Sequence, residues 1–348
     1  MKGKPVPLAV ESLVHGIDEN GLAGIALQKI KNNSVNDNRI ESALHQTAIH
    51  WHSIILARQP HLIQLAQHCN EQKIPILFMK GCCMSYNVYD SPGLRPSNDV
   101  DLIIKKDNLS SLWEILATLG YELPQDKQIK TLTYQFSGRK PLHGNHYLEL
   151  DIHHRLSNTE DFAKLFEFDE LQGRSSPLLT LHTDCRGLGK LDSILLACIH
   201  RQNHLIQNEP ERLAWLYDIH LLVQQLTPQD EAALIDLMKA KGLVNICKSA
   251  IQTTQLCFDT PVPEQLNKFL ITGNHPSELD KFLGSGPAKT IWFQFQAQPG
   301  WNQKLTLLKE LFLPSKQKIL EKYPNSKLPL SFLYIRRAVS GTLDRILK

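Results

Sequence analysis

The spacing of apolar residues divides this chain into a helical first part, a middle part that contains strands, and a helical second half. From residue 8 to 58 the apolar positions recur loosely at helical spacing. After Pro60 the spacing is stricter, because apolar residues between Leu62 and Cys69 fall at i, i+3, i+4 and i+7, and a helix is predicted to follow the proline. From about residue 190 onward the pattern is almost entirely helical.

Four short runs in the middle part predict β-strands. They cover residues 74–79, 99–104, 131–136 and 147–152. The last two strands are predicted to be joined through a polar segment that contains Gly138, Pro141 and Gly144. The layout predicts an α+β fold, with a helical lead-in, a compact unit that contains the strands, and a mostly helical C-terminal domain.

Capping residues predict where several helices begin and end. Asp107 is a candidate N-cap, and Gly120 stands where the C′ glycine of the same helix is expected. Thr227 followed by Pro228 predicts another helix start, and Gly242 predicts the end of that helix.

Length and composition are those of an ordinary globular protein of about two domains. The chain has 348 residues, of which 42% are hydrophobic and 21% are charged, so a disordered or collagen-like protein is excluded. We predict a helical lead-in at residues 1–59, a compact α/β unit at 60–165, and a helical domain with a basic end at 166–348.

Several features point away from secretion and from membrane insertion. The uncharged apolar runs, such as residues 194–199, are far shorter than the ~20 residues that cross a bilayer. Lys2 and Lys4 are followed too soon by Glu11 for the apolar core of a signal peptide. The seven cysteines form no CxxC pair, which favours a reducing compartment over a disulfide framework or a structural zinc site. We therefore predict a cytoplasmic protein.

Positive charge is concentrated near the C-terminus. The formal net charge is only +3, which is too small to indicate a nucleic-acid-binding protein. Residues 301–348, however, contain ten Lys or Arg and three acidic residues, a balance of +7. Such a segment can meet a phosphate-rich partner or a membrane surface, or it can be an ordinary solvated helical face.

The clearest candidate for chemistry is the sequence Asp99-Val100-Asp101 at the start of a predicted strand. Residues i and i+2 of a strand share a face, so the two carboxylates lie side by side. They repel each other unless a cation or a proton lies between them. A hard divalent ion such as Mg²⁺ suits this pair, although the same pattern also occurs on solvated strand ends.

A second strand can bring a third carboxylate to this pair. In the run 147–152, Glu149 and Asp151 share one face. Three carboxylates on adjacent strands can hold two metal ions ~3.5–4 Å apart, which clamp the attacking and leaving oxygens of a phosphoryl transfer. Upstream, Lys80-Gly81 lies between a strand and a predicted helix, where backbone N–H groups and a cation suit phosphate.

These motifs resemble the nucleotidyltransferase superfamily, which has the polymerase-β-like fold. The runs FMKGCCMSYNVYDSPGLRPSNDVDLII and YLELDIHHRL are most similar to a bacterial branch of uncharacterised nucleotidyltransferases. That branch has a Lys-Gly pair after the first strand, an arginine before a DxD strand, and Asp-x-His on a later strand. The matching residues are Lys80-Gly81, Arg95, Asp99 and Asp101, and Asp151-x-His153. The match covers about residues 60–160, and residues 200–222 resemble the helical domain of the branch more loosely.

The resemblance implies that the unit at 60–165 is a catalytic domain, built on a mixed sheet with flanking helices. It implies Mg²⁺- or Mn²⁺-dependent transfer of a nucleoside monophosphate from an NTP to a hydroxyl acceptor, with release of pyrophosphate. Asp99 and Asp101 would bind both metal ions, and Asp151 would hold the catalytic metal and help to deprotonate the acceptor. The residues expected to contact the nucleotide are Lys80, Gly81 and Arg95. The acceptor (a small molecule, a peptide, a protein side chain or an RNA end) does not follow from the resemblance.

The chain departs from the superfamily at one position, because Gly81 is followed by Cys82 where most members have serine or glycine. The expected triphosphate contact is therefore the least supported part of the match. Lys80 can also simply end a strand in solvent. Arg95 can pair with a nearby aspartate, Asp90 or Asp101, instead of contacting a nucleotide.

Other polar residues have both a functional and a structural interpretation. His153 can hydrogen-bond Asp151 behind a metal ion, or it can end the strand. Trp215 and Asp218 lie on a predicted amphipathic helix, where such a stripe is more typical of core packing than of a nucleotide contact. His200 and His204 are four residues apart, as in zinc-binding helices, but the intervening residues lack the glutamate of an HExxH motif.

Two other classes of function use similar residues. A glycosyltransferase also binds the metal of a nucleotide-sugar through DxD, but residues 1–98 look too helical for the nucleotide-binding domain that it needs before the motif. A catalytically silent binding module could keep the fold, but three clustered carboxylates are unfavourable without a cation. Nucleotidyl transfer remains the leading prediction.

Overall fold

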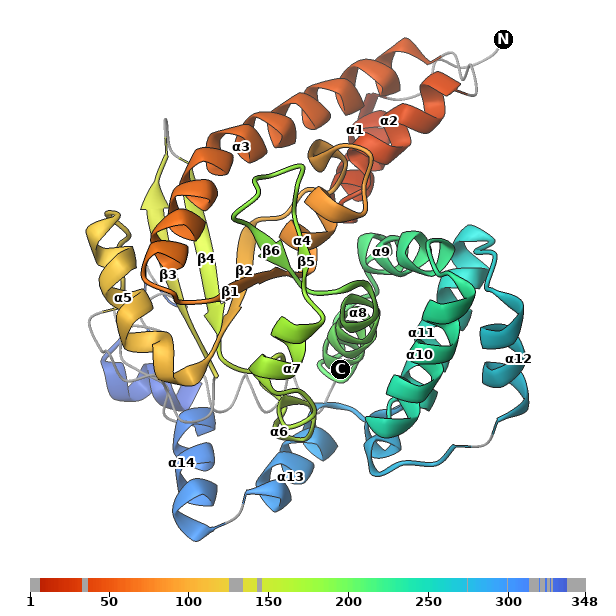
Figure 1. Cartoon of the computed structure of the whole chain (residues 1–348). Helices are drawn as coiled ribbons and strands as arrows, with labels where there is room; N and C mark the ends of the chain where they lie inside the picture. The colour runs from red at the N-terminus through yellow and green to blue at the C-terminus, as the bar shows by residue number, and fades with distance from the viewer. Residues whose placement is uncertain are drawn as a thin grey trace.

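A mixed β-sheet lies between two groups of helices (Figure 1). The computed structural model describes residues 7–32, 37–124, 134–142, 146–273, 275–298, 300–312, 319, 323, 326 and 328–336. Within these residues the sheet has six strands: β1 (Ile76–Met79), β2 (Asp99–Ile104), β3 (Gln135–Pro141), β4 (Tyr147–His153), β5 (Ser176–Pro177) and β6 (Arg186–Gly187). Their order in space is β3-β4-β2-β1-β6-β5. β2 is parallel to β4 and β1 is parallel to β6, whereas the other neighbours are antiparallel.

Most helices either precede the sheet or follow it. The helices that come before the last strand in the chain are α1 (Pro7–Glu19), α2 (Ala23–Asn32), α3 (Asn38–Glu71), α4 (Lys80–Asn87), α5 (Leu109–Thr118), α6 (Glu160–Ala163) and α7 (Phe168–Gly173). Those after it are α8 (Lys190–Leu205), α9 (Leu213–Gln224), α10 (Pro228–Ala240), α11 (Val244–Phe258), α12 (Glu264–Thr272), α13 (Pro287–Ala297) and α14 (Trp301–Phe312). Figure 1 shows α3 running across the top of the sheet, α8 to α12 gathered at the right, and α13 and α14 below. The predicted α+β class, with a mixed sheet followed by helices, is confirmed.

Alternation along the strands gives the sheet two different faces. Phe78 and Leu102 belong to a core that they share with α3 and α5. Leu77 and Ile103 lie on the opposite face of the sheet and belong to a core built largely from α8, α9, α10 and α11. Asp101 is two residues before Ile103 and therefore shares its face. The acidic side of β2 consequently faces the helical second half of the chain.

Most of the predicted helix boundaries are confirmed. Gly120 and Gly242 follow the C-caps of α5 and α10 with φ of 79° and 66°, a conformation that glycine adopts without a steric penalty. Thr227 and Asp230 form a capping box at the start of α10. The N-cap of α5 is Asn108 rather than the predicted Asp107, because a short 3₁₀ turn precedes the helix.

The helix predicted to follow Pro60 is instead the second half of one longer helix. α3 runs unbroken through Pro60 for 34 residues. Pro60 lies on the exposed side of α3, so the hydrogen bond that proline cannot donate is missing where water can reach the backbone. Buried residues on both sides of the proline, such as Leu44 and Leu65, hold the two halves in place.

The third strand lies later in the chain than predicted. Residues 131–133 are outside the described residues, and Gly138 and Pro141, predicted to lie in a connection, belong to β3. β3 is an edge strand, where polar residues and proline are tolerated, so its composition does not look like that of a strand. A Cβ on Gly138 would approach Leu123 Cδ2 to 2.8 Å, so the leucine side chain would have to shift to admit one.

The division of the chain at residues 59 and 165 stays a prediction. α3 extends across residue 60, and β5 and β6, which follow residue 165, complete the sheet beside β1. Much of the predicted basic end at 301–348 lies outside the described residues. Among the helices that are described, none combines the length and apolar character needed to cross a membrane.

Candidate active site

The three carboxylates predicted to cooperate lie on two neighbouring parallel strands. β2 carries Asp99 and Asp101, and β4 carries Asp151. The register places Asp101 directly opposite Asp151, and Asp99 opposite Glu149. The sheet therefore brings together the residues that the alternation pattern had placed on one face. Their roles in binding or catalysis stay predictions.

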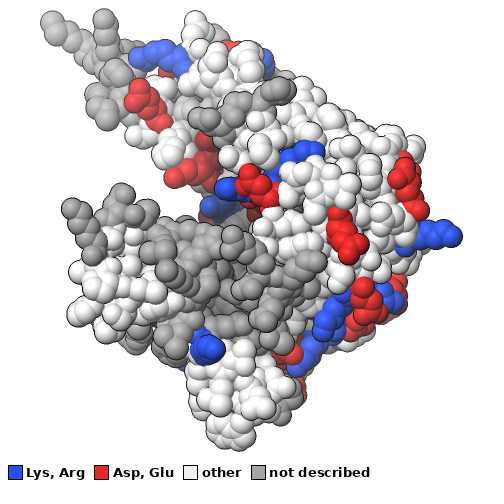
Figure 2. All heavy atoms as spheres, turned by 90° about the vertical axis from the view of Figure 1, so that its left-hand side faces the viewer, with Lys and Arg blue, Asp and Glu red and all other residues white. Residues whose placement is uncertain are grey.

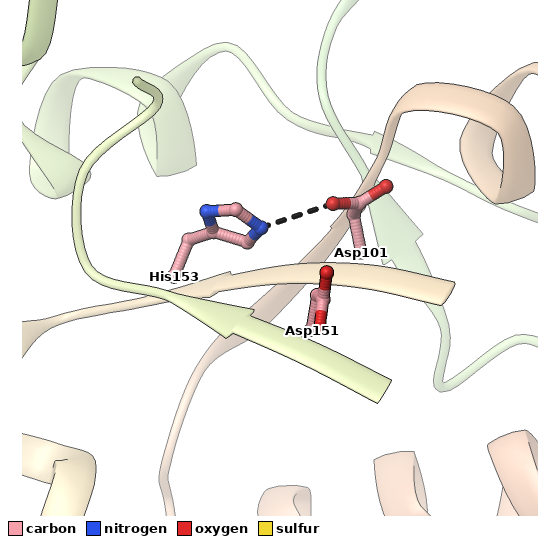
Figure 3. A group of neighbouring side chains, drawn as sticks. All are labelled: Asp101, Asp151 and His153. Atoms are coloured by element: carbon pink, nitrogen blue, oxygen red, sulfur yellow. Dashed lines mark hydrogen bonds and ion pairs between the residues drawn. The ribbon is translucent and has the colours of Figure 1, made fainter. Parts of the chain in front are cut away.

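Asp101 is the centre of the polar contacts in this group. Its Oδ1 accepts hydrogen bonds from Lys80 Nζ at 2.6 Å and from His153 Nε2 at 2.9 Å. Figure 3 shows His153 and Asp101 joined by this contact, with Asp151 next to them. Burial alone would raise the pKa of Asp101, but the Lys80 ammonium and the His153 hydrogen bond hold it well below its usual range. Asp101 is therefore ionised at neutral pH.

Asp99 has a less favourable environment for its charge. Burial, and then the negative charges of Asp101 and Asp151, raise the pKa of Asp99 above its ordinary value. Ser97 Oγ donates to the Asp99 backbone oxygen at 2.5 Å and lies 3.2 Å from Oδ1, which offsets part of this cost. A cation between these carboxylates would remove the repulsion.

The residues present fit a divalent cation. Asp101, Asp151 and His153 each offer one ligand atom, and these atoms lie within 4.8 Å of one another. Oxygen ligands of this kind suit Mg²⁺ and Mn²⁺, whereas an imidazole nitrogen favours the softer ions of the first transition row. Asp99 does not belong to this group of three. The set of candidate ligands therefore includes His153, which the sequence suggested only as a supporting residue.

The segment Lys80-Gly81 begins α4 directly after β1. Lys80 has a φ of 51°, which is unfavourable for a residue with a side chain. A Cβ on Gly81 would lie 3.1 Å from Ser97 Cβ, so glycine allows the loop before β2 to pack on the start of the helix. The lysine predicted to bind phosphate thus pairs with Asp101.

Arg95 is buried in an ion pair with a distant residue. Its Nε and Nη2 donate to the two oxygens of Asp218 on α9, at 2.8 and 2.7 Å, and Nη1 donates to the Pro96 carbonyl. Tyr89 Oη also donates to Asp218, at 2.8 Å. Arg95 does form a salt bridge, but its partner is neither Asp90 nor Asp101. Its predicted contact with a nucleotide stays a prediction.

Arg58 supports the loop before Asp99, and the sequence analysis did not identify it. It extends from α3 and donates to the backbone oxygens of Ser97 and Asn98, at 2.6 and 2.7 Å. Burial lowers the pKa of its guanidinium, and the nearby charge of Asp99 opposes this shift. Arg58 therefore fixes the two residues that precede Asp99. The available signal was an arginine within the apolar stripe that contains Ile55 and Leu62.

Arg58→Met is expected to lower the free energy of unfolding by about 1–3 kcal/mol, because the buried guanidinium loses its two hydrogen bonds to the loop carbonyls. Urea denaturation measures this change. Arg39→Met is the matched control, since Arg39 lies on the same helix and its side chain is exposed beside Asp37. Equal losses in the two variants would show that the Arg58 hydrogen bonds do not hold the loop.

Asp99 and Asp101 open into a cleft of about 750 Å³ between the sheet and α8. Its floor contains Lys80, Gly81, Ser97, Asp99 and Asp101. Residues 18–21 and Trp51 line it from the N-terminal helices, and residues of α8 and α9 line it from the second half of the chain. A cleft of this size is ordinary for a small-molecule or nucleotide ligand.

One wall of the cleft is aromatic. The ring of Trp215 lies 5.0 Å from that of His200 and 4.2 Å from that of His204, between centroids. Burial, and then the charge of Lys80, hold the pKa of His200 well below its ordinary value, so this imidazole is neutral. Trp215 was predicted to pack in the core, and it is indeed mostly buried, but it also lines the cleft. Arg212 lies over its ring at 5.6 Å.

Comparison with known proteins agrees with the resemblance seen in the sequence. None of the curated proteins matches this chain. A crystal structure of an antigenic nucleotidyltransferase-like protein from Paracoccidioides brasiliensis is similar at 15% identity and a TM-score of 0.34, over 55% of this chain and 92% of that one. A TM-score this low carries no argument about function.

The family model described as "Uncharacterised nucleotidyltransferase" matches residues 8–259, which include every strand of the sheet and the whole cleft. The chain therefore belongs to this family of uncharacterised nucleotidyltransferases.

Proposed function

We propose that this protein transfers a nucleoside monophosphate from an NTP to an acceptor hydroxyl, with pyrophosphate as the second product. The observation that carries the proposal is the parallel pairing of β2 with β4, which sets Asp101, a residue that lines a large cleft, opposite Asp151. Lys80 stands beside them as a cation for phosphate. Family membership supports transferase chemistry at this place in the fold.

Asp101 and Asp151 are the proposed holders of a divalent cation, with His153 beside them and Asp99 as a further carboxylate. Such an ion, when bound, neutralises charge on the phosphates and makes the acceptor hydroxyl more acidic. Mg²⁺ or Mn²⁺ fits the oxygen ligands. Lys80 and the cation would compete for Asp101, so Lys80 would be released to pair with the phosphates of the NTP.

The transfer forms a bond between the acceptor oxygen and the α-phosphorus of the NTP. It breaks the bond from that phosphorus to the oxygen that bridges to the β-phosphate, and this oxygen leaves with pyrophosphate. The acceptor loses a proton, for which Asp151 is the proposed base. Among the described residues Ser137 Oγ donates to Asp151 Oδ1 at 2.6 Å, which orients the carboxylate and keeps Oδ2 available.

The remaining parts of the cleft have proposed roles in binding. The neutral His200 and the rings of His204 and Trp215 suit the base or the ribose, since they are flat and mostly uncharged. The N-terminal wall at residues 18–21 adjoins the start of α9, where Leu213 N donates to Asn20 Oδ1 at 3.0 Å, and it suits the acceptor. Arg95 contributes by tying the loop before β2 to α9 through Asp218.

Labelled nucleotides test this function directly. The protein is incubated with Mg²⁺ or Mn²⁺ and with NTPs that carry ³²P at either the α or the γ position, and a cell extract serves as the source of acceptor. We expect the α label, and not the γ label, to appear on the acceptor. Protein with both Asp99→Asn and Asp101→Asn is expected to transfer no label.

The other outcomes of this assay contradict the proposal in different ways. Transfer of the γ label would indicate a kinase-like reaction. Transfer of the α label by the double variant would show that these carboxylates are not required. Absence of transfer across several extracts, combined with no metal-dependent NTP binding in a thermal-shift assay, would indicate a module without this activity.

A further inference from the structure

The helices α13 and α14 expose large apolar side chains at the end of the molecule that is remote from the cleft. Trp292 on α13 is 56% exposed and Trp301 on α14 is 74% exposed. Leu305 on α14 is more than half exposed as well. In Figure 2 the lower end of the molecule, where Figure 1 places α13 and α14, presents mainly uncharged side chains. Large exposed aromatic residues that cluster in this way indicate an interaction surface.

These side chains form a defined group around one lysine. The rings of Trp292 and Phe295 are stacked, with centroids 6.0 Å apart and planes at 16°. Lys304 Nζ lies 5.2 Å from the Phe295 ring centroid and 5.4 Å from that of Trp301. We call Trp292, Phe295, Trp301, Lys304 and Leu305 the aromatic–lysine patch.

The sequence of α13 and α14 around the patch is rich in lysine. Residues 281–309 contain four lysines and no aspartate or glutamate, and of these lysines Lys281 is paired with Asp161 at 3.1 Å. A positive surface of this kind is complementary to an anionic partner, and it opposes pairing with a second copy of the same patch. Tryptophan and lysine together are typical of segments that lie at the interface of a lipid bilayer.

We propose that the aromatic–lysine patch binds the surface of an anionic membrane. Single-stranded nucleic acid would also attract lysines and stack on tryptophans. Nucleic acid does not favour contact with exposed aliphatic groups, however, whereas Leu305 would enter the boundary between headgroups and acyl chains. The lysines supply the attraction to anionic headgroups, and the aromatic and aliphatic groups supply the apolar contact.

This placement leaves the proposed active site open. α13 packs against α6 and α14 packs against α13, whereas the cleft is lined by residues 18 to 218 and by no residue of α13 or α14. A protein held through the patch can therefore still exchange nucleotide and acceptor with solution. Membrane binding and nucleotidyl transfer are thus independent of each other and can be tested separately.

Vesicle sedimentation with the full chain tests the proposal. Vesicles of phosphatidylcholine alone are compared with vesicles that also contain phosphatidylserine, and single-stranded RNA is assayed in parallel. We expect binding only to the anionic vesicles, with an affinity that falls as salt is added. Trp292→Ser with Trp301→Ser is expected to weaken vesicle binding roughly tenfold or more, and Lys289→Glu with Lys304→Glu to do the same.

A matched control removes exposed apolar groups elsewhere. Leu179 and Leu256 are 68% and 86% exposed, a range comparable with that of the tryptophans, and Leu179→Ser with Leu256→Ser is expected to leave vesicle binding unchanged. Circular dichroism and thermal unfolding check that all variants fold. Equal binding to both kinds of vesicle, absence of binding to anionic vesicles, binding to RNA alone, or self-association through the patch would each overturn the proposal.

Discussion

Asp101→Asn protein is expected to transfer nucleotide roughly 10³-fold more slowly than the wild type. Asp101 lies opposite Asp151 and accepts hydrogen bonds from both Lys80 and His153. The asparagine keeps the shape of the side chain, but it loses the charge that would hold a cation. Its amide would also leave the Lys80 ammonium without a counter-charge. The rate of α-label transfer at saturating NTP measures this effect.

The control for this variant is Asp107→Asn, because Asp107 lies just beyond the other end of β2 and is exposed. It is expected to keep wild-type activity. A wild-type rate of transfer for Asp101→Asn would show that Asp101 is not required for the reaction. Titration of Mn²⁺ provides a second readout, since the variant should need a higher concentration of the ion.

The same variant has a defined effect on stability. The pKa of Asp101 is lowered in the folded protein, so the unfolded chain binds the proton more readily. The stability that Asp101 contributes is therefore complete above the ordinary aspartate pKa of about 4, and it is lost as the pH falls through the lower folded value. The difference in unfolding free energy between wild type and Asp101→Asn should be largest near neutral pH and shrink in acid.

Arg95→Met is expected to cost about 3–5 kcal/mol of unfolding free energy, the largest stability effect of any change considered for this chain. The substitution leaves Asp218 as a buried charge, with only Tyr89 and surrounding dipoles to stabilise it. The ion pair also connects the loop before β2 to α9, so its loss is expected to loosen the cleft. Urea denaturation with the wild type alongside measures the change.

The double variant Arg95→Met with Asp218→Leu is the informative control. Both charges are then removed, and an apolar pair of similar volume is expected to recover most of the lost stability. If the double variant were as unstable as the single one, the loss would come from packing rather than from an unpaired charge. A raised KM for NTP in the stable double variant would show that Arg95 also contacts the nucleotide.

The local geometry of the site was predictable from the sequence. In a strand, alternation places residues i and i+2 on one face whatever surrounds them, so Asp99 and Asp101 had to point together. The same argument applied to Glu149 and Asp151. Capping and turn residues such as Gly120 and Thr227 act within a few positions along the chain, and they too were identified correctly.

Features that depend on burial or on an edge position were harder to predict. β3 is polar because it lies at the edge of the sheet, and nothing in its composition signals a strand. α3 continues through Pro60 because the proline faces solvent and the flanking residues are buried. In both cases the surroundings in three dimensions outweighed the local preference.

The sequence by itself determined the two acidic strands, their shared acidic faces and the family to which the chain is related. Only the tertiary structure decided which groups surround those faces. Arg95 pairs with Asp218, 123 residues away, and Arg58 holds the loop before Asp99 from about 40 residues away. The physical reason is that backbone alternation is a local property, whereas a buried charge takes whichever partner the packed chain brings within hydrogen-bond distance.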